Sequence, residues 1–344
     1  MIKNFRRSGL PSKVLLAALI ASSAVVPSVP AHAEMARVKV ATQFGLGYLP
    51  LIIMGHDKLW EKAAKKASVE VTTEFSQLGG GATLNDALLS GSVQLVAGGA
   101  SGMLLLWDRT RKNFGVKALV AGNISSIYLV SNKDSIKSVK DITENDRIAV
   151  PGVGSGSIQA IYLAMAAEKE FGKGNSGRFD SQQVAMQLPD AYAALVNGGT
   201  PVTVAYLSSP FQERALTNPK IHKIADSFEI QGAPATVNVT YAKADFVRDN
   251  PKLVAAFYEA FREAMALIKA NPRLSIDKYV EATGDKTDKA LLLSILTGPQ
   301  FSFDIAPKNT KQLADFLART KVLSVAPTSW KDYFFDAAHN LDGG

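Results

Sequence analysis

Short apolar runs alternate with longer amphipathic stretches along most of this chain, and this alternation is the feature that most limits its fold. Residues 37–42 (RVKVAT) alternate as a strand does, residues 51–66 have a helical pattern, and residues 69–74 (VEVTTE) return to the strand pattern. Strands that alternate with helices are typical of βαβ units. The sequence therefore predicts an α/β fold with a mainly parallel sheet.

The same alternation continues to about residue 241, after which helices dominate. We expect strands at 94–97, 116–121, 127–131, 147–150, 182–186, 202–207, 221–225 and 237–241, and helices at 82–89, 104–114, 158–170, 190–196 and 211–217. Further helices are expected at 245–250, 253–270, 275–283, 288–296, 308–320 and 329–339. In the longest of these, apolar residues recur every three or four positions, which predicts one buried face; they are Leu253, Phe257, Phe261, Met265 and Ile268.

Residues 1–33 have the pattern of a secretory signal peptide. Four basic residues precede the apolar run 14–26, and the small-residue sequence AHA ends at Ala33. Thirteen apolar residues are too few for a membrane span of about 20, so we expect cleavage after Ala33 rather than an anchor. The general secretory route is preferred, although Arg6-Arg7 also permits the twin-arginine route.

Charge and composition exclude several classes of function. The chain has a formal net charge of +7, and removal of the four basic residues of the signal leaves about +3, which argues against nucleic-acid binding. There is no cysteine, and the four histidines lie far apart, so we expect no disulfide, no local metal site and no cofactor. No second apolar stretch is long enough for a membrane helix, so we expect the exported form to be soluble.

Two parts of the sequence are alike in kind. Residues 86–91 (DALLSG) and 192–198 (YAALVNG) both end a helix at glycine and precede a short apolar strand. This recurrence suggests two lobes of similar plan, with a chance echo of a common helix ending as the alternative.

Four segments carry a family resemblance over residues 38–335. In chain order they are VATQFGLGYLPLIIMGHDKLWEKAAKK, GGGATLNDALLSGSVQLVAGGASGMLLL, SIKSVKDITENDRIAVPGVGSGSIQAIYLAMAAEKEFG and FVRDNPKLVAAFYEAFREAMALIKANP. Their order and spacing resemble periplasmic substrate-binding proteins of ABC importers of the nitrate/sulfonate/taurine type. Two departures concern the fold rather than the ligand: Gln94 stands where the family usually has Asp, and residues 141–144 (DITE) where it often has D-L-K-G.

The resemblance implies an α/β, two-lobed periplasmic-binding-protein fold of type II, with two crossover strands as the hinge. Lobe one is expected at 36–131 and 233–344, and lobe two at 132–232. The implied protein is a periplasmic monomer that captures a small molecule by lobe closure and delivers it to an ABC permease and its ATPase. Ligands of the family include alkanesulfonates, taurine, nitrate, aromatic carboxylates and pyrimidine precursors of thiamine.

Five Gly- or Ser-rich loops are the candidate binding segments, because open α/β sheets bind ligands at the carboxyl ends of their strands. They cover residues 43–48, 77–83, 98–102, 152–157 and 206–210. From these loops and the expected first crossover, the candidate ligand-binding residues are Phe44, Gly47, Tyr48, Gly80, Gly81, Ser101, Ser126, Gly154, Ser155, Gly156, Ser157 and Ser208.

Two of these loops, 77–83 and 152–157, open helices, whose free amide groups and dipole attract anions. Loop 152–157 is no dinucleotide fingerprint, because Ser157 stands where G-x-G-x-x-G needs its third glycine. For every loop a structural alternative remains: Phe44 and Tyr48 in the core, and Ser101 or Ser208 as a helix cap.

None of the five loops contains Lys, Arg, Asp or Glu. Backbone amides and hydroxyls would then hold the ligand, which favours a sulfonate or carboxylate with an uncharged apolar tail. We expect no enzyme, since there is no cysteine nucleophile or usable Gly-x-Ser-x-Gly elbow and the histidines are scattered. The alternatives are an exported ligand sensor with the same cleft and an enzyme of the pyrimidine-synthesis branch of the fold, whose Cys-rich motif is absent from this sequence.

Overall fold

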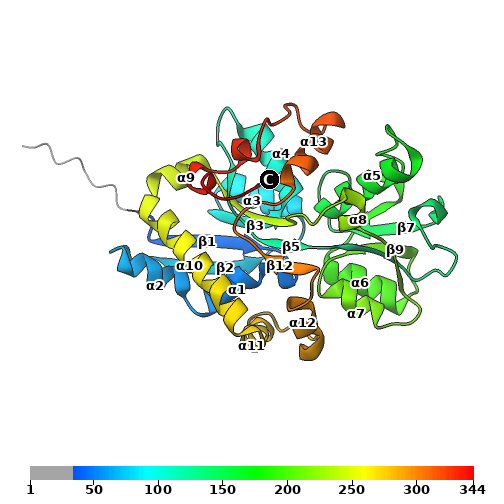
Figure 1. Ribbon diagram of the computed structural model, residues 1–344, viewed down its shortest axis with the longest axis horizontal. Helices are drawn as coiled ribbons and strands as arrows, with labels where there is room; N and C mark the ends of the chain where they lie inside the picture. Colours follow the sequence, from blue (N-terminus) through cyan, green and yellow to red (C-terminus); the bar gives the residue numbers. More distant parts are fainter. Residues whose placement is uncertain (1–33) are drawn as a thin grey trace, which may run out of the picture. The chain divides into compact units, whose positions relative to one another are not determined.

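The computed structural model describes residues 34–344, and the predicted signal peptide lies outside them. The described part contains two five-stranded sheets and a two-stranded ribbon, surrounded by helices (Figure 1). The α/β class expected from the alternating pattern is therefore confirmed. No helix between residues 34 and 344 combines the length and the apolarity that a membrane span requires.

The first sheet has the strand order β2-β1-β3-β11-β4. Its strands are β1 (Arg37–Thr42), β2 (Thr72–Gln77), β3 (Leu95–Gly99), β4 (Lys117–Ala121) and β11 (Asn238–Ala242). β2 and β3 run parallel to β1, whereas β11 runs antiparallel to both β3 and β4.

The second sheet has the order β10-β6-β9-β7-β8. Its strands are β6 (Tyr128–Ser131), β7 (Arg147–Val150), β8 (Gln183–Ala185), β9 (Val202–Leu207) and β10 (His222–Asp226). β8 and β9 run parallel to β7, and β6 runs antiparallel to β9 and β10. In each sheet four of the five strands point the same way, as the expected mainly parallel sheet requires, and one strand makes the sheet mixed. The exceptions are β11 and β6, which enter from the other half of the chain and each insert between two strands in the opposite direction.

Two segments, residues 122–127 and 232–237, connect the sheets and run side by side. The amide of Val237 donates to the carbonyl of Asn123 at 2.9 Å, and Ile124 forms an antiparallel bridge with Thr236. Within the first segment, β5 (Asn123–Ser125) also pairs with β12 (Phe301–Phe303), and neither strand was expected from the sequence. We call β5, β12 and residues 232–237 the crossing ribbon.

The boundaries of the two lobes stay a prediction, but sheet membership differs from it at one strand. Residues 128–131 were expected in lobe one, whereas the strand that they form, β6, belongs to the second sheet.

Thirteen α-helices lie within residues 34–344. They are α1 (Leu49–His56), α2 (Leu59–Lys66), α3 (Gly81–Ser90), α4 (Ala100–Thr110), α5 (Ile158–Phe171), α6 (Leu188–Asn197), α7 (Phe211–Leu216), α8 (Ser227–Gln231), α9 (Ala244–Asp249), α10 (Pro251–Ala270), α11 (Pro272–Thr283), α12 (Lys289–Leu296) and α13 (Thr310–Arg319). Most match an expected helix, but α8 was missed.

Two expected helices are wrong as single elements. Residues 51–66 divide into α1 and α2, because Lys58 adopts a left-handed conformation (φ 53°) that cannot continue a helix. Residues 329–339 form two short 3₁₀ turns, η4 (Trp330–Tyr333) and η5 (Asp336–Ala338), instead of one α-helix.

The two faces of each sheet are covered by different helices. Alternate residues of a strand point to opposite faces, so in β7 Ile148 and Val150 join one apolar cluster while Ala149 joins another. On one face of the first sheet, α10 packs against α1 and α2, where the Trp60 indole donates to the Leu253 carbonyl at 2.9 Å and stacks edge-on against Phe257. The predicted apolar face of α10 is buried, with Met265 only partly so.

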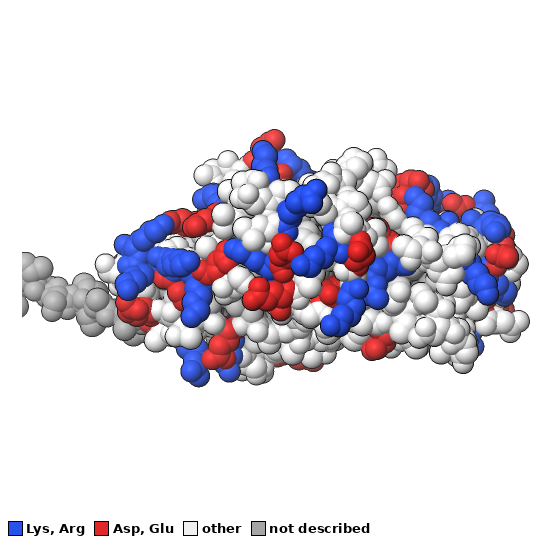
Figure 2. Space-filling model, turned by 90° about the horizontal axis from the view of Figure 1, so that it is seen from below, with Lys and Arg blue, Asp and Glu red and all other residues white. Residues whose placement is uncertain are grey.

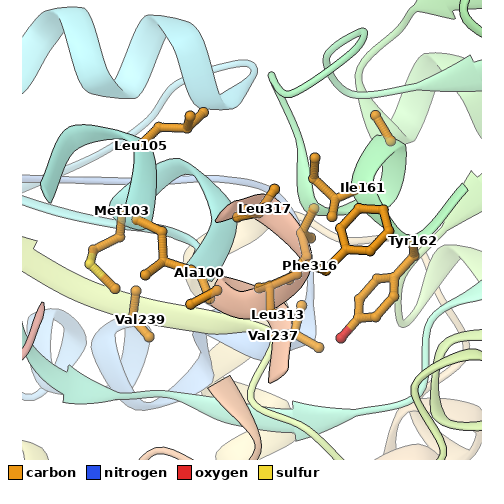
Figure 3. Close-up of a cluster of buried hydrophobic side chains, with 14 of the residues drawn as sticks. Ala100, Met103, Leu105, Ile161, Tyr162, Val237, Val239, Leu313, Phe316 and Leu317 are labelled. Carbon is orange, nitrogen blue, oxygen red and sulfur yellow. The ribbon is translucent and has the colours of Figure 1, made fainter. Parts of the chain in front are cut away.

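A second apolar cluster extends from the first sheet to the second. Figure 3 shows residues of α4, α5, α13 and β11 in this cluster, together with Val237 just before β11: Ala100, Met103, Leu105, Ile161, Tyr162, Leu313, Phe316, Leu317, Val237 and Val239. Beside it, the Arg319 guanidinium of α13 forms two contacts with the Glu168 carboxylate of α5, at 2.5 and 3.2 Å. Helices that belong to different sheets are thus packed directly against each other.

Charged side chains of both signs are interspersed on the face of the molecule seen in Figure 2. A face without a large area of one sign has little long-range attraction for a charged ligand.

Candidate functional site

The carboxyl ends of β1, β3, β7 and β9 open into one cavity between the two sheets. Its empty space is about 710 Å³, counting the side that is open to solvent, which is in the range of small-molecule sites. Phe44, Ser101, Ser157 and Ser208, one from the loop after each strand, line it. This is the position at which open α/β sheets bind ligands, and we call it the cleft.

Eight of the twelve candidate residues line the cleft, namely Phe44, Gly47, Tyr48, Gly81, Ser101, Gly156, Ser157 and Ser208. Gly80, Gly154 and Ser155 do not, although they belong to the same loops; the amide of Gly154 donates to Gln183 Oε1 at 2.8 Å instead. Ser126 does not line the cleft either and faces a different cavity. Whether the eight contact a ligand stays a prediction.

Several lining residues were missed in the sequence. Gln187 and Leu188 follow β8, so the rule that selected the other loops would have found them as well. Asn238 and Tyr241 lie within β11, and Phe301 lies in β12. No local pattern marks them, because they reach the cleft only through long-range strand pairing.

Ser101 is a fully buried hydroxyl without a partner. It lies in the first turn of α4 and is 0% exposed, and its Oγ has no hydrogen-bond partner in the structure. The helix cap is Gly99, and no side chain caps the helix, so the alternative in which Ser101 acts as a cap is wrong. A buried polar group without a partner costs free energy, and a ligand atom in the cleft would supply that partner.

Ser157 and Ser208 differ from Ser101 because their hydroxyls already form hydrogen bonds with protein atoms. Ser157 is the cap of α5: its Oγ accepts from the amide of Ala160 at 3.2 Å and donates to the Gly152 carbonyl at 2.7 Å. Ser208 Oγ accepts from Gln159 Nε2 at 3.1 Å, which leaves its own proton free to donate. Ser101, Ser208 and Ser125, whose Oγ accepts from Asn123 Nδ2, are therefore the serine donors that the cleft can offer.

Four helices begin at the wall of the cleft. Gly81, Ile158 and Leu188 are the first residues of α3, α5 and α6, and Ser101 lies in the first turn of α4. In the order α3 to α6 the helices have 10, 11, 14 and 10 residues, and they come from both halves of the fold. Amide groups in first turns carry partial positive charge, so the cleft is suited to a small anion although it contains no cation.

Neutral amides and hydroxyls cover the wall formed by the crossing ribbon and β11. Asn123 Nδ2 donates to Ser125 Oγ at 2.8 Å, and Asn123 Oδ1 has no partner. Tyr48 Oη lies 3.1 Å from Gln43 Oε1 and 3.2 Å from Asn238 Oδ1. Burial raises the pKa of Tyr48 far above its ordinary value, so this hydroxyl stays neutral.

No Lys, Arg, Asp, Glu or His from the described range 34–344 lines the cleft. Three apolar side chains, Phe44, Leu188 and Phe301, also line it. The cleft thus combines amide and hydroxyl donors with an apolar surface, and it contains no group that would balance a ligand ammonium.

The two halves of the fold touch at glycines beside the cleft. A Cβ atom placed on Gly81 would lie 2.7 Å from the carbonyl oxygen of Gly156, which comes from the other half. A Cβ atom placed on Gly45 (φ +123°) would lie 2.9 Å from the Ser209 carbonyl oxygen, which accepts a hydrogen bond from the amide of Leu46 at 3.0 Å. Only glycine fits these contacts, so the backbones on the two sides of the cleft meet directly.

The chain thus has two mixed β-sheets covered by helices, two paired segments that cross between the sheets, and a cleft at the crossing. This arrangement is the periplasmic-binding-protein fold. Among solved structures with this architecture is the alkanesulfonate-binding protein SsuA from Xanthomonas axonopodis pv. citri, bound to MOPS. It is 17% identical to this chain, with a TM-score of 0.66, over 86% of this chain and 96% of its own.

Two further structures are similar at the same level. The aliphatic sulphonate-binding protein SsuA from Escherichia coli has 16% identity and a TM-score of 0.63, over 88% of this chain and 93% of its own. The nitrate-binding protein NrtA from Synechocystis PCC 6803 has 14% identity and a TM-score of 0.64, over 87% of this chain and 84% of its own. No sequence-family model and no curated protein matches this chain. The likeness therefore shows the fold.

Proposed function

We propose that this chain is the solute-binding component of an ABC importer and that its ligand is a small organic anion. The observation that carries the proposal is the uncharged cleft, at which four helices begin and a fully buried Ser101 hydroxyl lacks a partner. The similarity to importer binding proteins supports the class, and the predicted signal peptide supports the periplasm as its location.

The ligand class follows from the two kinds of group that line the cleft, polar donors and apolar side chains. A single negative charge fits the first turns of α3, α4 and α5 together with the hydroxyls of Ser101 and Ser208. An apolar tail fits against Phe44, Leu188 and Phe301. A sulfonate or carboxylate with an uncharged tail meets both conditions, whereas taurine would bury an ammonium group without a carboxylate partner.

Lobe closure is the proposed mechanism. The two sheets would rock about the crossing ribbon, and the ligand would favour the closed form because it contacts both halves only there. The closed monomer would then dock on a membrane permease that is driven by an ATPase.

A thermal-shift screen of residues 34–344 tests the ligand class. We expect ethanesulfonate, butanesulfonate or octanoate to raise the unfolding midpoint, since binding to the native state stabilises it. Taurine is the matched control for ethanesulfonate, because the two differ only by the ammonium group. A midpoint raised by taurine as much as by ethanesulfonate, or by none of the anions, would contradict the proposed ligand. Turnover of any compound that binds would contradict the proposed class.

A further inference from the structure

A second cavity lies behind the cleft, against the crossing ribbon. Its empty space is about 570 Å³, counting its open side, and it is lined from three directions: by Ser126 and Tyr128 of the first crossing segment and β6, by Gln212 and Glu213 of α7, and by Gln300 before β12. Ser209 and Phe301 line both this cavity and the cleft. We call it the crossing cavity.

The Glu213 carboxylate has no cationic partner in the part of the chain that the structure describes. Its Oε1 accepts from Ser209 Oγ and from Gln212 Nε2, both at 2.8 Å, and these donors are neutral. Its Oε2 is buried and has no hydrogen-bond partner. Buried carboxylates are normally paired with a cation. Burial without such a partner raises the pKa of Glu213, so ionisation of this carboxyl would place an uncompensated negative charge in the crossing cavity.

A second oxygen without a partner lines the same cavity. Ser126 is 2% exposed, and its Oγ has no hydrogen-bond partner. Gln212 Nε2, which donates to Glu213, also donates to the backbone carbonyl of Ser126 at 3.0 Å, so one amide group holds both residues together. Two of the buried side-chain atoms without partners in residues 34–344 therefore belong to one small site.

The charges around this site are negative on balance. Burial and the carboxylates of Glu213, Asp226 and Glu229 raise the pKa of Tyr128 to about 12. Lys223 is the nearby cation, but its Nζ is bonded to Asp226 Oδ2 at 2.8 Å. Burial tends to raise the pKa of Asp226, but Lys223 and the amide of Glu229 hold it below its ordinary value. Lys223 is thus already paired with Asp226, and no cation pairs with the Glu213 carboxylate within residues 34–344.

We propose that the crossing cavity binds a small monovalent cation, ammonium or an alkali ion, with Glu213 as its charged ligand and Ser126 as a neutral one. A divalent ion fits less well, because such ions take several carboxylate ligands. No group of three or more metal-ligating side chains was found between residues 34 and 344. The site is independent of the proposed anion, although Ser209 and Phe301 connect it to the cleft.

The test is the thermal unfolding midpoint of residues 34–344 in KCl, NaCl and NH₄Cl, with choline chloride keeping the ionic strength constant. Choline carries the same charge but is too bulky for a site between two side chains. We expect a saturable rise of about 2 °C in the wild type with at least one small cation. If only ammonium raises the midpoint, ammonium is the cation that the site binds. If K⁺ or Na⁺ raises it, the site binds an alkali ion. Equal midpoints in all four salts would overturn the proposal.

The Glu213→Gln variant removes the charge but keeps an oxygen for the Ser209 and Gln212 donors. We expect it to lose the cation response, whereas Glu144→Gln, which removes an exposed carboxylate of the same half, keeps it. A response that survives in Glu213→Gln, or disappears in Glu144→Gln, would contradict the assignment. If Glu213→Gln does not fold, Ser126→Ala decides: a need for at least about threefold more cation supports the site, and an unchanged titration refutes it.

Discussion

Ser101 and Ser157 are two serines of one cleft with opposite hydrogen-bonding states, and this difference can be tested. Ser101→Ala removes a hydroxyl that no protein atom uses, so we expect the free protein to keep its stability while the affinity for the bound anion falls by about 1 kcal/mol. Calorimetric titration with the anion that gives the largest thermal shift measures this change. Unchanged affinity would show that Ser101 does not contact the ligand.

Ser157→Ala is the matched comparison. This substitution removes the cap of α5, so we expect the free energy of unfolding to fall by about 1 kcal/mol in urea titrations. Loss of affinity without loss of stability in this variant would reverse the roles that we assign to the two serines.

Glu213 predicts a defined dependence of stability on pH. Burial raises its pKa above the ordinary value, so the folded chain binds a proton more tightly than the unfolded chain. The stabilisation is present at low pH and is lost as the pH rises through the raised pKa. In choline buffers, we therefore expect Glu213→Gln to gain stability relative to the wild type from about pH 4 to pH 7.

Urea unfolding of both proteins across that range measures the effect. The other groups that face Glu213 do not mask it, because Tyr128 titrates near pH 12 and Lys223 holds Asp226 in its charged form. A stability difference that does not change with pH would mean that Glu213 is not desolvated.

Residue by residue, the sequence predicts the local part of the site and misses the long-range part. Phe44, Ser101, Ser157 and Ser208 follow strands that can be recognised, so the rule for strand ends finds them. Asn123, Asn238 and Phe301 reach the cleft from the crossing ribbon and β11, whose pairing joins residues far apart in the chain. A single sequence carries no periodic signal for such pairing.

At the scale of elements, α10 is the helix that the sequence predicts best, and its burial gives a stability prediction. Phe257 is 0% exposed and packs against Trp60 and Phe261. Phe257→Ala should lower the free energy of unfolding by about 3–5 kcal/mol, measured in urea. The control is Leu274→Ala, since Leu274 is 52% exposed and its loss should change little. A cost below about 1 kcal/mol for Phe257→Ala would show that the α10 contact contributes little to stability.

The elements that the sequence assigns wrongly have identifiable causes. α1 and α2 have one continuous helical pattern, and the break arises from the backbone of a lysine, a residue type without a preference for left-handed conformations. β5 and β12 have three residues each, too few for an alternating pattern to show. The direction of β6 and β11 depends on how the chain crosses between the sheets, which local patterns do not contain.

At the scale of the whole molecule, Gly81 controls how closely the two halves approach. Gly81→Ala places a Cβ atom 2.7 Å from the Gly156 carbonyl, so the halves would have to separate slightly. We expect the variant to fold normally but to bind the anion about 1–3 kcal/mol more weakly, the usual cost of overpacking. Titration calorimetry measures the affinity, and small-angle scattering with ligand measures the remaining separation. Gly344→Ala, where the added atom has free space, is the control. Wild-type affinity in Gly81→Ala would show that this contact is dispensable.

The crossing ribbon restricts the directions in which the sheets can move. Three neighbouring backbone segments in hydrogen-bonded register form a flat strip, which flexes easily across its thin dimension and resists shear along its plane. We therefore expect the two halves to open by rotation about one axis and not by independent motion in several directions. Because the native chain contains no cysteine, fluorophores on two engineered thiols would report that rotation without background labelling.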